Sequence, residues 1–442
     1  MPQLTFVLTA PSLPMTMPVR SLTVLQNWDC NGCTMCCRSY HVSVSDQERD
    51  RIEAQGWDRE PEYQGTPLFV LEGHAGRGFS RRLNHRADGS CVFLGADNRC
   101  RIHAKFGSAA KPFACRVFPF VLVPAGDHWR VGLRYACPAA PTNSGRPLTE
   151  HLAELGEYAS TLESQHAGVI ASTPPTPLQA GQVVPWPDLI RLTNAVSLTL
   201  ADDEDTLERR WRRVLGLADL CRKSIFDGGG NAEKAITGGR LNEFLDLLRQ
   251  AMQEETPAME EMPRPGWVGR NVFRQLLALY CRKDRGPEKG HALTSPLRRM
   301  GAALRFALGS GRIPQVHAAL PAARFAEAEA EGDRFSQAAA EVLTRYYRVK
   351  VESLQFCGPT NFYLTFWDGL ESLALTLPAI GWLSRILERD GRSHEDAVTR
   401  ALGIVDDNFG FNPLLGRGRQ KFALRLIANR GELSRLIAWY GR

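Results

Sequence analysis

Eight of the eleven cysteines in this 442-residue chain lie between residues 30 and 137. Four form one run, Cys30-Asn-Gly-Cys33-Thr-Met-Cys36-Cys37, and the others are Cys91, Cys100, Cys115 and Cys137. Thiols two residues apart can converge on one metal ion, because the turn between them points both sulfurs the same way and offers N–H groups to them. Free buried thiols are common singly, but they do not explain four cysteines in eight residues. The C-x2-C-x2-C-C run therefore predicts a metal site.

The residues leave the identity of the metal open. Zinc suits all-thiolate tetrahedral sites, and eight cysteines could hold two ions. Cys30, Cys33 and Cys36 also keep the spacing of ferredoxin ligands, and Cys137-Pro138 resembles a distal Cys-Pro ligand. If the site holds a [4Fe–4S] cluster, we expect those four as its ligands, with Cys37, Cys91, Cys100 and Cys115 supporting them or forming a second site. We expect the adjacent pair Cys36 and Cys37 not to ligate one ion without strain.

Basic residues surround the later cysteines. Residues 77–116 contain nine Lys or Arg and only two acids, Asp88 and Asp97. Four thiolates on one Zn²⁺ or on a [4Fe–4S]²⁺ core leave a net charge of about −2, which nearby cations would offset. A nucleic-acid surface is the weaker interpretation, because few aromatic residues interleave with the basic ones. Five histidines could replace a cysteine as ligand, although each is better explained as a surface or supporting residue: His41, His74, His85, His103 and His128.

The overall composition is that of a soluble globular protein, with 43% hydrophobic and 23% charged residues and a net charge of +6. An odd number of cysteines fits a disulfide framework poorly, and the first residues lack the basic region of a signal peptide. We therefore expect a cytoplasmic protein without a membrane partner. The most apolar long window, Leu364–Leu383, contains Asp368 and Glu371, so we interpret it as a buried core helix.

The pattern predicts an α+β protein with a small cysteine-rich domain and a larger, mostly α-helical domain. We expect a flexible tail over residues 1–22, a metal-binding domain with short β-hairpins over 23–142, a helix and proline-rich connector over 143–187, and the helical domain over 188–442. In the small domain, Ser45 and Glu48 predict a helix with a capping box. Strands are expected at 79–85, 91–94, 99–102, 118–123 and 129–135.

Apolar residues at three- and four-residue spacing predict the helices of the larger domain. They are expected at 189–200, 205–226, 240–253, 268–283, 295–307, 322–356, 364–389 and 394–407. Cys221 and Cys281 fall on such helices and are expected in the core, as are Phe362, Tyr363, Phe366 and Trp367. Cys357 is expected as a buried turn residue. Glu204 and Asp205 with four arginines, Arg209, Arg210, Arg212 and Arg213, are interpreted as a solvated helix face.

Four ordered motifs carry a family resemblance. They are the Cys30–Cys37 run, Gly89-Ser-Cys91-Val-Phe-Leu94, Asn98-Arg-Cys100-Arg-Ile102-His103 and Lys111-Pro-Phe-Ala-Cys115-Arg116-Val-Phe118-Pro119-Phe120. In this order they resemble the YkgJ-type cysteine cluster family of proposed zinc- or iron-chelating domains, over about residues 28–138. The resemblance implies metal binding by the eight clustered cysteines.

A weaker, whole-chain resemblance is to flagellin lysine-N-methylase proteins, which also have a cysteine cluster followed by a long helical region. It implies a protein lysine methylase that uses S-adenosylmethionine and a protein substrate, although no strand, glycine-rich loop and acid are arranged for that cofactor. A third hypothesis is a metal-stabilised scaffold whose helical part holds a partner protein. The catalytic residues and the S-adenosylmethionine-binding residues of such an enzyme stay unidentified.

Overall fold

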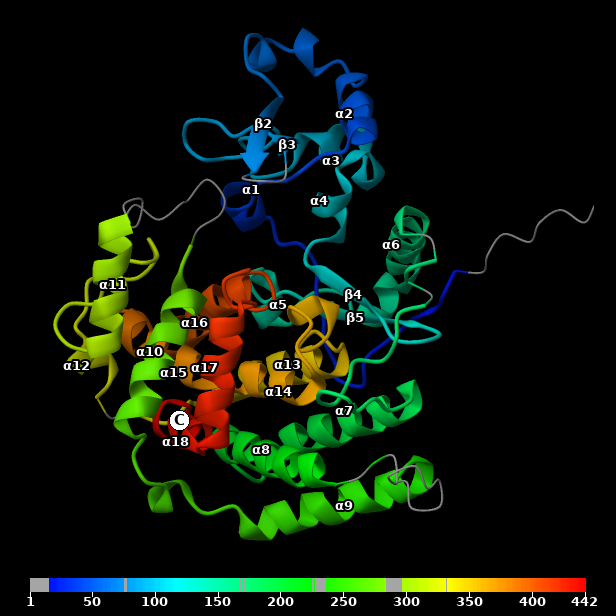
Figure 1. Cartoon of the computed structure of the whole chain (residues 1–442). Helices are drawn as coiled ribbons and strands as arrows, with labels where there is room; N and C mark the ends of the chain where they lie inside the picture. Colours follow the sequence, from blue (N-terminus) through cyan, green and yellow to red (C-terminus); the bar gives the residue numbers. More distant parts are fainter. Residues whose placement is uncertain are drawn as a thin grey trace, which may run out of the picture.

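The computed structural model describes residues 16–74, 78–166, 168–170, 172–224, 226, 236–283, 296–330 and 332–442. The fold is α+β, as expected, with short strands in the N-terminal third and helices through the rest of the chain. Figure 1 shows a small cysteine-rich unit in blue and cyan at one end of the molecule, next to a larger body of helices coloured from green to red. Residues 1–15 of the expected tail lie outside the described residues. Residues 16–22 include strand β1 (Val19–Arg20), which pairs with a later strand.

The small unit is built from short elements around its own core. The helices are α1 (Met35–Ser39), α2 (Asp46–Glu53), α3 (Arg101–Phe106) and α4 (Phe113–Val117), and the hairpin is β2 (Phe69–His74) with β3 (Gly78–Leu83). Three short 3-10 helices, Trp57–Arg59, Pro61–Tyr63 and Ser108–Ala110, complete it. The predicted capping box is present, because the Ser45 hydroxyl accepts from the Glu48 N–H while the Glu48 carboxylate accepts from the Ser45 N–H. The core is Val44, Ile52, Trp57, Tyr63, Leu83, Val92, Phe93 and Ile102.

Two strands expected in this unit are wrong. Cys91 and Leu94 make only isolated β-bridges, to His85 and Cys100 respectively. Residues from Arg101 onward turn into helix α3, with Cys100 at its N-cap. The reason is local: Asp97 Oδ1 accepts from the Arg99 N–H, and Asn98 takes a positive φ of 62°, so the chain reverses too tightly to extend a strand.

A second sheet joins the cysteine-rich region to the helical body. Its order is β1–β5–β4, with β5 (Trp129–Leu133) antiparallel to β4 (Phe120–Pro124) and parallel to β1. Strand β5 packs against helix α13 (Gln337–Glu352). Val24, Phe120 and Leu133 therefore belong to the same continuous core as the large helices.

Most of the remaining helices follow the predicted apolar spacing, but the last two in the chain were not expected. They are α5 (Ala139–Thr142), α6 (Leu152–Gln165), α7 (Trp186–Ala201), α8 (Leu207–Lys223), α9 (Gly238–Glu255), α10 (Trp267–Cys281), α11 (Pro296–Leu308), α12 (Phe325–Ala328), α13, α14 (Phe366–Ala374), α15 (Thr376–Glu388), α16 (His394–Asn408), α17 (Gly418–Asn429) and α18 (Glu432–Tyr440); three more 3-10 helices cover Leu148–His151, Met259–Glu261 and Pro359–Asn361. The helix expected over 322–356 is broken, because Ser336 starts α13 by capping the Ala339 N–H. Pro378 lacks an N–H for the Ala374 carbonyl, which accounts for the break between α14 and α15.

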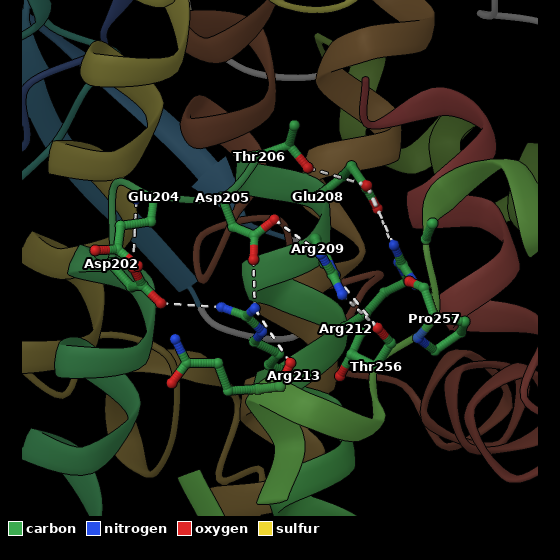
Figure 2. Close-up of polar contacts among 12 residues, drawn as sticks. Asp202, Glu204, Asp205, Thr206, Glu208, Arg209, Arg212, Arg213, Thr256 and Pro257 are labelled. Carbon is green, nitrogen blue, oxygen red and sulfur yellow. Dashed lines mark hydrogen bonds and ion pairs between the residues drawn. The ribbon is translucent and has the colours of Figure 1, made fainter. Parts of the chain in front are cut away.

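Three of the four α8 arginines that were expected on a solvated face are buried, so that interpretation is wrong for them. Arg210, Arg212 and Arg213 are at most 5% exposed. Figure 2 shows how their charges are satisfied: Arg212 pairs with Glu208 at 2.8 Å, and Arg213 pairs with Asp202 at 2.9 Å and with Asp205. Arg209 and Arg212 also donate to the carbonyls of Thr256 and Pro257 after α9. The cluster therefore joins α8 to the chain that follows α9.

The apolar segment near residue 370 lies in the core, as its acids predicted. Phe366–Glu388 is long and apolar enough to cross a membrane, but 94% of its most apolar window is buried inside the molecule. Phe366 and Trp367 are fully buried, whereas Tyr363 is 79% exposed, so its expected place in the core is wrong. Cys221 and Cys281 are buried in the core, as predicted.

Candidate metal centre

The Cys30–Cys37 run forms a tight loop that leads into helix α1. Gly32 takes a positive φ of 70°, a conformation that glycine adopts without strain, and the Asn31 side-chain oxygen accepts from the Cys33 N–H at 3.2 Å. The Thr34 carbonyl then accepts from the Cys37 N–H at 2.9 Å, which begins α1. Cys30 and Cys33 are exposed on the loop, while Cys36 and Cys37 are half-buried on the helix.

The four later cysteines arrive from four separate segments of the chain. The Cys91 N–H donates to the Cys37 carbonyl at 2.8 Å, which fixes that segment directly beside α1. Cys100 caps α3, Cys115 lies on α4, and both pack with Cys91 against the small core. Cys137 lies at the other side, in the large core just before α5. The fold therefore gathers cysteines that are up to 107 residues apart in sequence.

The thiol pKa values are shifted by burial and by other thiols of the cluster. Burial raises the pKa of Cys115, and the Cys91, Cys100 and Cys36 thiols add to the rise. Burial likewise raises the pKa of Cys91 to about 12, with Cys100 and Cys36 contributing. On the other side, burial raises the pKa of Cys137 to about 11, and Cys33 and Cys36 contribute. Cys36 thus neighbours two groups: Cys91, Cys100 and Cys115, and Cys33 with Cys137.

Helix α1 places the sulfurs of Cys36 and Cys37 close to each other. The Sγ atoms of Cys36 and Cys37 lie 3.9 Å apart. A tetrahedron of sulfurs around zinc, with a Zn–S distance of about 2.3 Å, has an edge of about 3.8 Å. The distance between the two sulfurs does not fix whether they share an ion, so the expectation that these neighbours do not ligate one ion without strain stays a prediction.

The thiols are gathered without being closed into a coordination sphere. Within the described residues, no three or more His, Cys, Asp or Glu side chains stand close enough together to hold one metal ion. The donor set nevertheless fits a thiophilic metal, since thiols predominate and the carboxylates nearby are engaged elsewhere: Asp88 accepts from Ser90 and Arg38. Metal binding would have to draw sulfurs from α1, α3 and α4 closer together.

Two of the expected basic residues lie near the thiols, and one histidine adjoins them. Arg86 and Lys111 oppose the rise in thiol pKa at Cys91 and Cys115 respectively. Arg86 is held in place by donating to the Leu94 and Val92 carbonyls at 2.7 and 2.8 Å. His85 is bridged to Cys91, and burial, His41 and Arg82 lower its pKa to about 4, so its ring is neutral at physiological pH.

Several basic residues of this region line a groove. It has a volume of about 1050 Å³ and is lined by Trp57 and by Arg38, Arg86, Arg99, Arg101 and Lys105, among others. Acids from outside the basic run pair with several of them: Glu60 with Lys105 at 2.6 Å and with Arg101 at 2.8 Å, and Glu62 with Arg101. These pairs reduce the positive charge that the sequence alone indicated.

Sequence reasoning missed the buried acids that anchor the cysteine segments to the helical body. Glu352 accepts from the Thr23 and Val24 N–H groups at 2.7 and 3.0 Å, ahead of the cysteine run. Asp407 accepts from the Tyr40 hydroxyl at 2.9 Å, directly after α1. Asp406 accepts from the Ala136 N–H at 3.0 Å, next to Cys137. Their position in apolar helices was the only available signal.

Cys357 offers no activated thiol. It is buried, and burial raises its pKa to about 12, which disfavours the thiolate. The prediction of a buried turn residue is confirmed, because Cys357 precedes Gly358 in a turn closed by a bridge to Leu364.

The comparisons with known proteins address only the cysteine-rich region. No curated protein and no solved structure matches the chain. The resemblance to flagellin lysine-N-methylases is therefore unsupported by any relative. Residues 29–138 do match the model of the CxxCxxCC family, which is described as "Putative zinc- or iron-chelating domain".

Proposed function

We propose that residues 29–138 bind zinc or iron through thiols drawn from Cys30, Cys33, Cys36, Cys37, Cys91, Cys100, Cys115 and Cys137. One observation carries the proposal: the Cys91 N–H donates to the Cys37 carbonyl at 2.8 Å, and Cys91, Cys100 and Cys115 pack against the same small core although they come from separate segments. Such convergence of half-buried cysteines needs a chemical reason, and the ligand chemistry of the set suits a soft metal. No observation favours the methylase or the scaffold hypothesis.

The two groups around Cys36 favour two centres. One would use Cys91, Cys100 and Cys115 with a thiol from α1, and the other would use Cys30, Cys33 and Cys137 with the second thiol from α1. Adjacent Cys36 and Cys37 supply one thiol to each, which explains why the run ends in two cysteines. Zinc in such sites would stabilise the fold, and an iron–sulfur cluster would supply electron transfer.

The chain's own residues have definite tasks in either case. Cys91 and Cys137 release their protons on binding, since burial raises the pKa of both thiols and so keeps them neutral in the metal-free protein. Arg86 and Lys111 offset the negative charge of the thiolates. Gly32 lets the loop between Cys30 and Cys33 turn without strain, because glycine adopts its positive φ freely.

Metal analysis of anaerobically purified protein tests the proposal. We expect stoichiometric zinc in colourless protein, or iron and sulfide in brown protein with broad visible absorption. Cys36→Ser should lower the metal content most, because Cys36 neighbours both groups. Cys221→Ala, which removes a buried thiol of the helical body, is the matched control and should keep the full metal content. Metal-free native protein, or equal losses in both variants, would refute the proposal.

A further inference from the structure

Helix α11 carries an exposed apolar stripe. Leu297, Met300, Leu304 and Leu308 are 74%, 66%, 59% and 65% exposed. Their spacing of three, four and four residues places them on one side of the helix, within about 80° of arc at about 100° per residue. Four large apolar side chains on one face of a 13-residue helix exceed the scattered exposure that is normal for a surface.

The opposite side of α11 holds it firmly on the molecule. Ala302 and Phe306 are buried, and the Phe306 ring packs edge-to-face on Phe325 at a centroid distance of 5.4 Å. Arg274 donates to the Phe306 carbonyl at 2.9 Å, which satisfies part of the C-terminal end of the helix. The stripe is therefore a preformed surface on an anchored helix at the edge of the molecule (Figure 1).

A tryptophan extends this surface at one end. Trp267, the first residue of α10, is 70% exposed. Asn271, one turn later on the same side of α10, donates to the Ala307 carbonyl at 2.8 Å. Trp267 therefore lies one turn before the residue of α10 that contacts the C-terminal end of α11. Exposed tryptophans are frequent anchors of protein interfaces.

The charges on α11 are all positive. Its sequence, from Pro296 to Leu308, contains Arg298, Arg299 and Arg305 and no acid. Arg298 and Arg305 flank one edge of the stripe, at about 100–120° from its centre. Two arginines in the first turn oppose the helix dipole, so they do not serve the stability of the helix itself. An acidic partner would match both the arginines and the positive N-terminal end.

We propose that this stripe, with Trp267, docks an acidic amphipathic helix of a partner protein. A second copy of α11 would bring six arginines together, which disfavours self-association. A helix that lies on an anionic membrane needs a wider apolar face than this stripe provides. A narrow apolar stripe is typical of helix–helix packing. The partner helix should present leucine-like residues every three to four positions, with Glu or Asp beside them.

A binding assay on the full chain tests this. The probe is a fluorescent helical peptide of about three heptads, with Leu at the first and fourth positions and Glu at most others; the matched peptide carries Lys in place of Glu. We expect the Glu peptide to bind and the Lys peptide not to bind. Leu304→Asp should weaken binding about tenfold or more. Leu247→Asp, at a residue of α9 that is 67% exposed, should change it less than about twofold.

Charge reversal gives a second readout. The double variant Arg298→Glu and Arg305→Glu should weaken binding of the Glu peptide and permit binding of the Lys peptide. Equal binding of both peptides, no binding of either, or no effect of Leu304→Asp would overturn the proposal. So would co-sedimentation with phosphatidylserine vesicles, or dimerisation in the ultracentrifuge, if Leu304→Asp abolishes it.

Discussion

At the scale of single residues, two consecutive acids on α16, Asp406 and Asp407, bind partners from distant parts of the sequence. Asp407 binds Lys283 at 2.6 Å, Arg134 at 3.0 Å and the Tyr40 hydroxyl. Burial alone would raise the pKa of Asp407, but Lys283 and Arg134 outweigh it and hold the pKa below its usual range. Asp406 pairs with the fully buried Lys350 at 2.7 Å. One turn of helix thus connects the cysteine run, the sheet and the helical body.

Removing the Asp407 carboxylate should be costly. Asp407→Ala would leave Lys283 and Arg134, which are 6% and 13% exposed, without their partner. Breaking a buried pair in this way costs about 3–5 kcal/mol of unfolding free energy. Asp396→Ala on the same helix removes an exposed pair with Arg392 and should cost at most about 1 kcal/mol. Urea unfolding compares the two variants, and similar losses would contradict the role of Asp407.

Glu371 should make stability depend on pH. It pairs with Arg222 at 2.5 Å, and burial raises its pKa from 4.5 to about 7. Between these values the folded state binds the proton more tightly than the unfolded chain does, so stability falls as pH rises from about 4.5 to about 7, by about 3 kcal/mol in all.

Glu371→Gln cannot titrate and should lose less stability than the native protein between pH 5 and pH 8. Unfolding in urea at the two pH values measures the difference. Glu243→Gln, on the exposed side of α9, should keep the native pH dependence. An unchanged slope in Glu371→Gln would show that this carboxyl does not titrate in the interval.

At the scale of elements, close helix crossings set the packing of the body. A Cβ on Gly381 of α15 would lie 1.8 Å from the Tyr440 carbonyl oxygen of α18. Gly381→Ala should therefore separate the two helices and cost about 3 kcal/mol or more. Gly156→Ala in α6, where a Cβ meets nothing within 4 Å, should instead gain about 1 kcal/mol. Thermal unfolding of both variants checks this, and a neutral Gly381→Ala would contradict the crossing.

Most large elements could be predicted from sequence because their apolar spacing is regular. Helix α7 was found within a few residues of its bounds since buried Leu189, Leu192 and Val196 follow the helical period. Helices α17 and α18 were not predicted: α17 buries only Leu424 and Ile427, too few for a clear stripe. The α8 arginines were misplaced because their partners, the carbonyls of Thr256 and Pro257, are distant in sequence.

The candidate site was predicted by residue type but not by arrangement. The cysteine spacing indicated which thiols to consider, since it depends on local turns such as that at Gly32. It could not indicate that Cys36 neighbours two groups, because that depends on where α3 and α4 pack. The anchoring acids Glu352 and Asp407 were equally hidden, since their partners are more than 300 residues away.

At the scale of the molecule, two apolar cores meet at the cysteine region. The small core has eight buried residues, and Cys91, Cys100 and Cys115 pack against it. Cys137 and strands β4 and β5 belong to the large core instead. Metal in the proposed sites would therefore link two bodies of very different size.

Metal removal should loosen only one of these bodies. Structural zinc contributes about 10–16 kcal/mol in small zinc peptides, which exceeds what a core of eight side chains supplies. After verified metal loss, hydrogen exchange should become fast over residues 42–115 and stay slow in β4 and β5. Equal loss of protection in both regions, or unchanged protection in residues 42–115, would contradict the two-core description.

The sheet formed by β1, β5 and β4 limits how the cysteine-rich region could be combined with other domains in evolution. Residues 29–138 match a recognisable family, yet strand β5 rests on α13, more than 200 residues further along the chain. If this segment were fused to another protein, strand β5 would lack the helix on which it packs and its apolar face would be exposed to solvent. The Tyr40 hydroxyl would also lack its acceptor, Asp407. Its inheritance as a functional cassette requires the recipient to supply a substitute for α13.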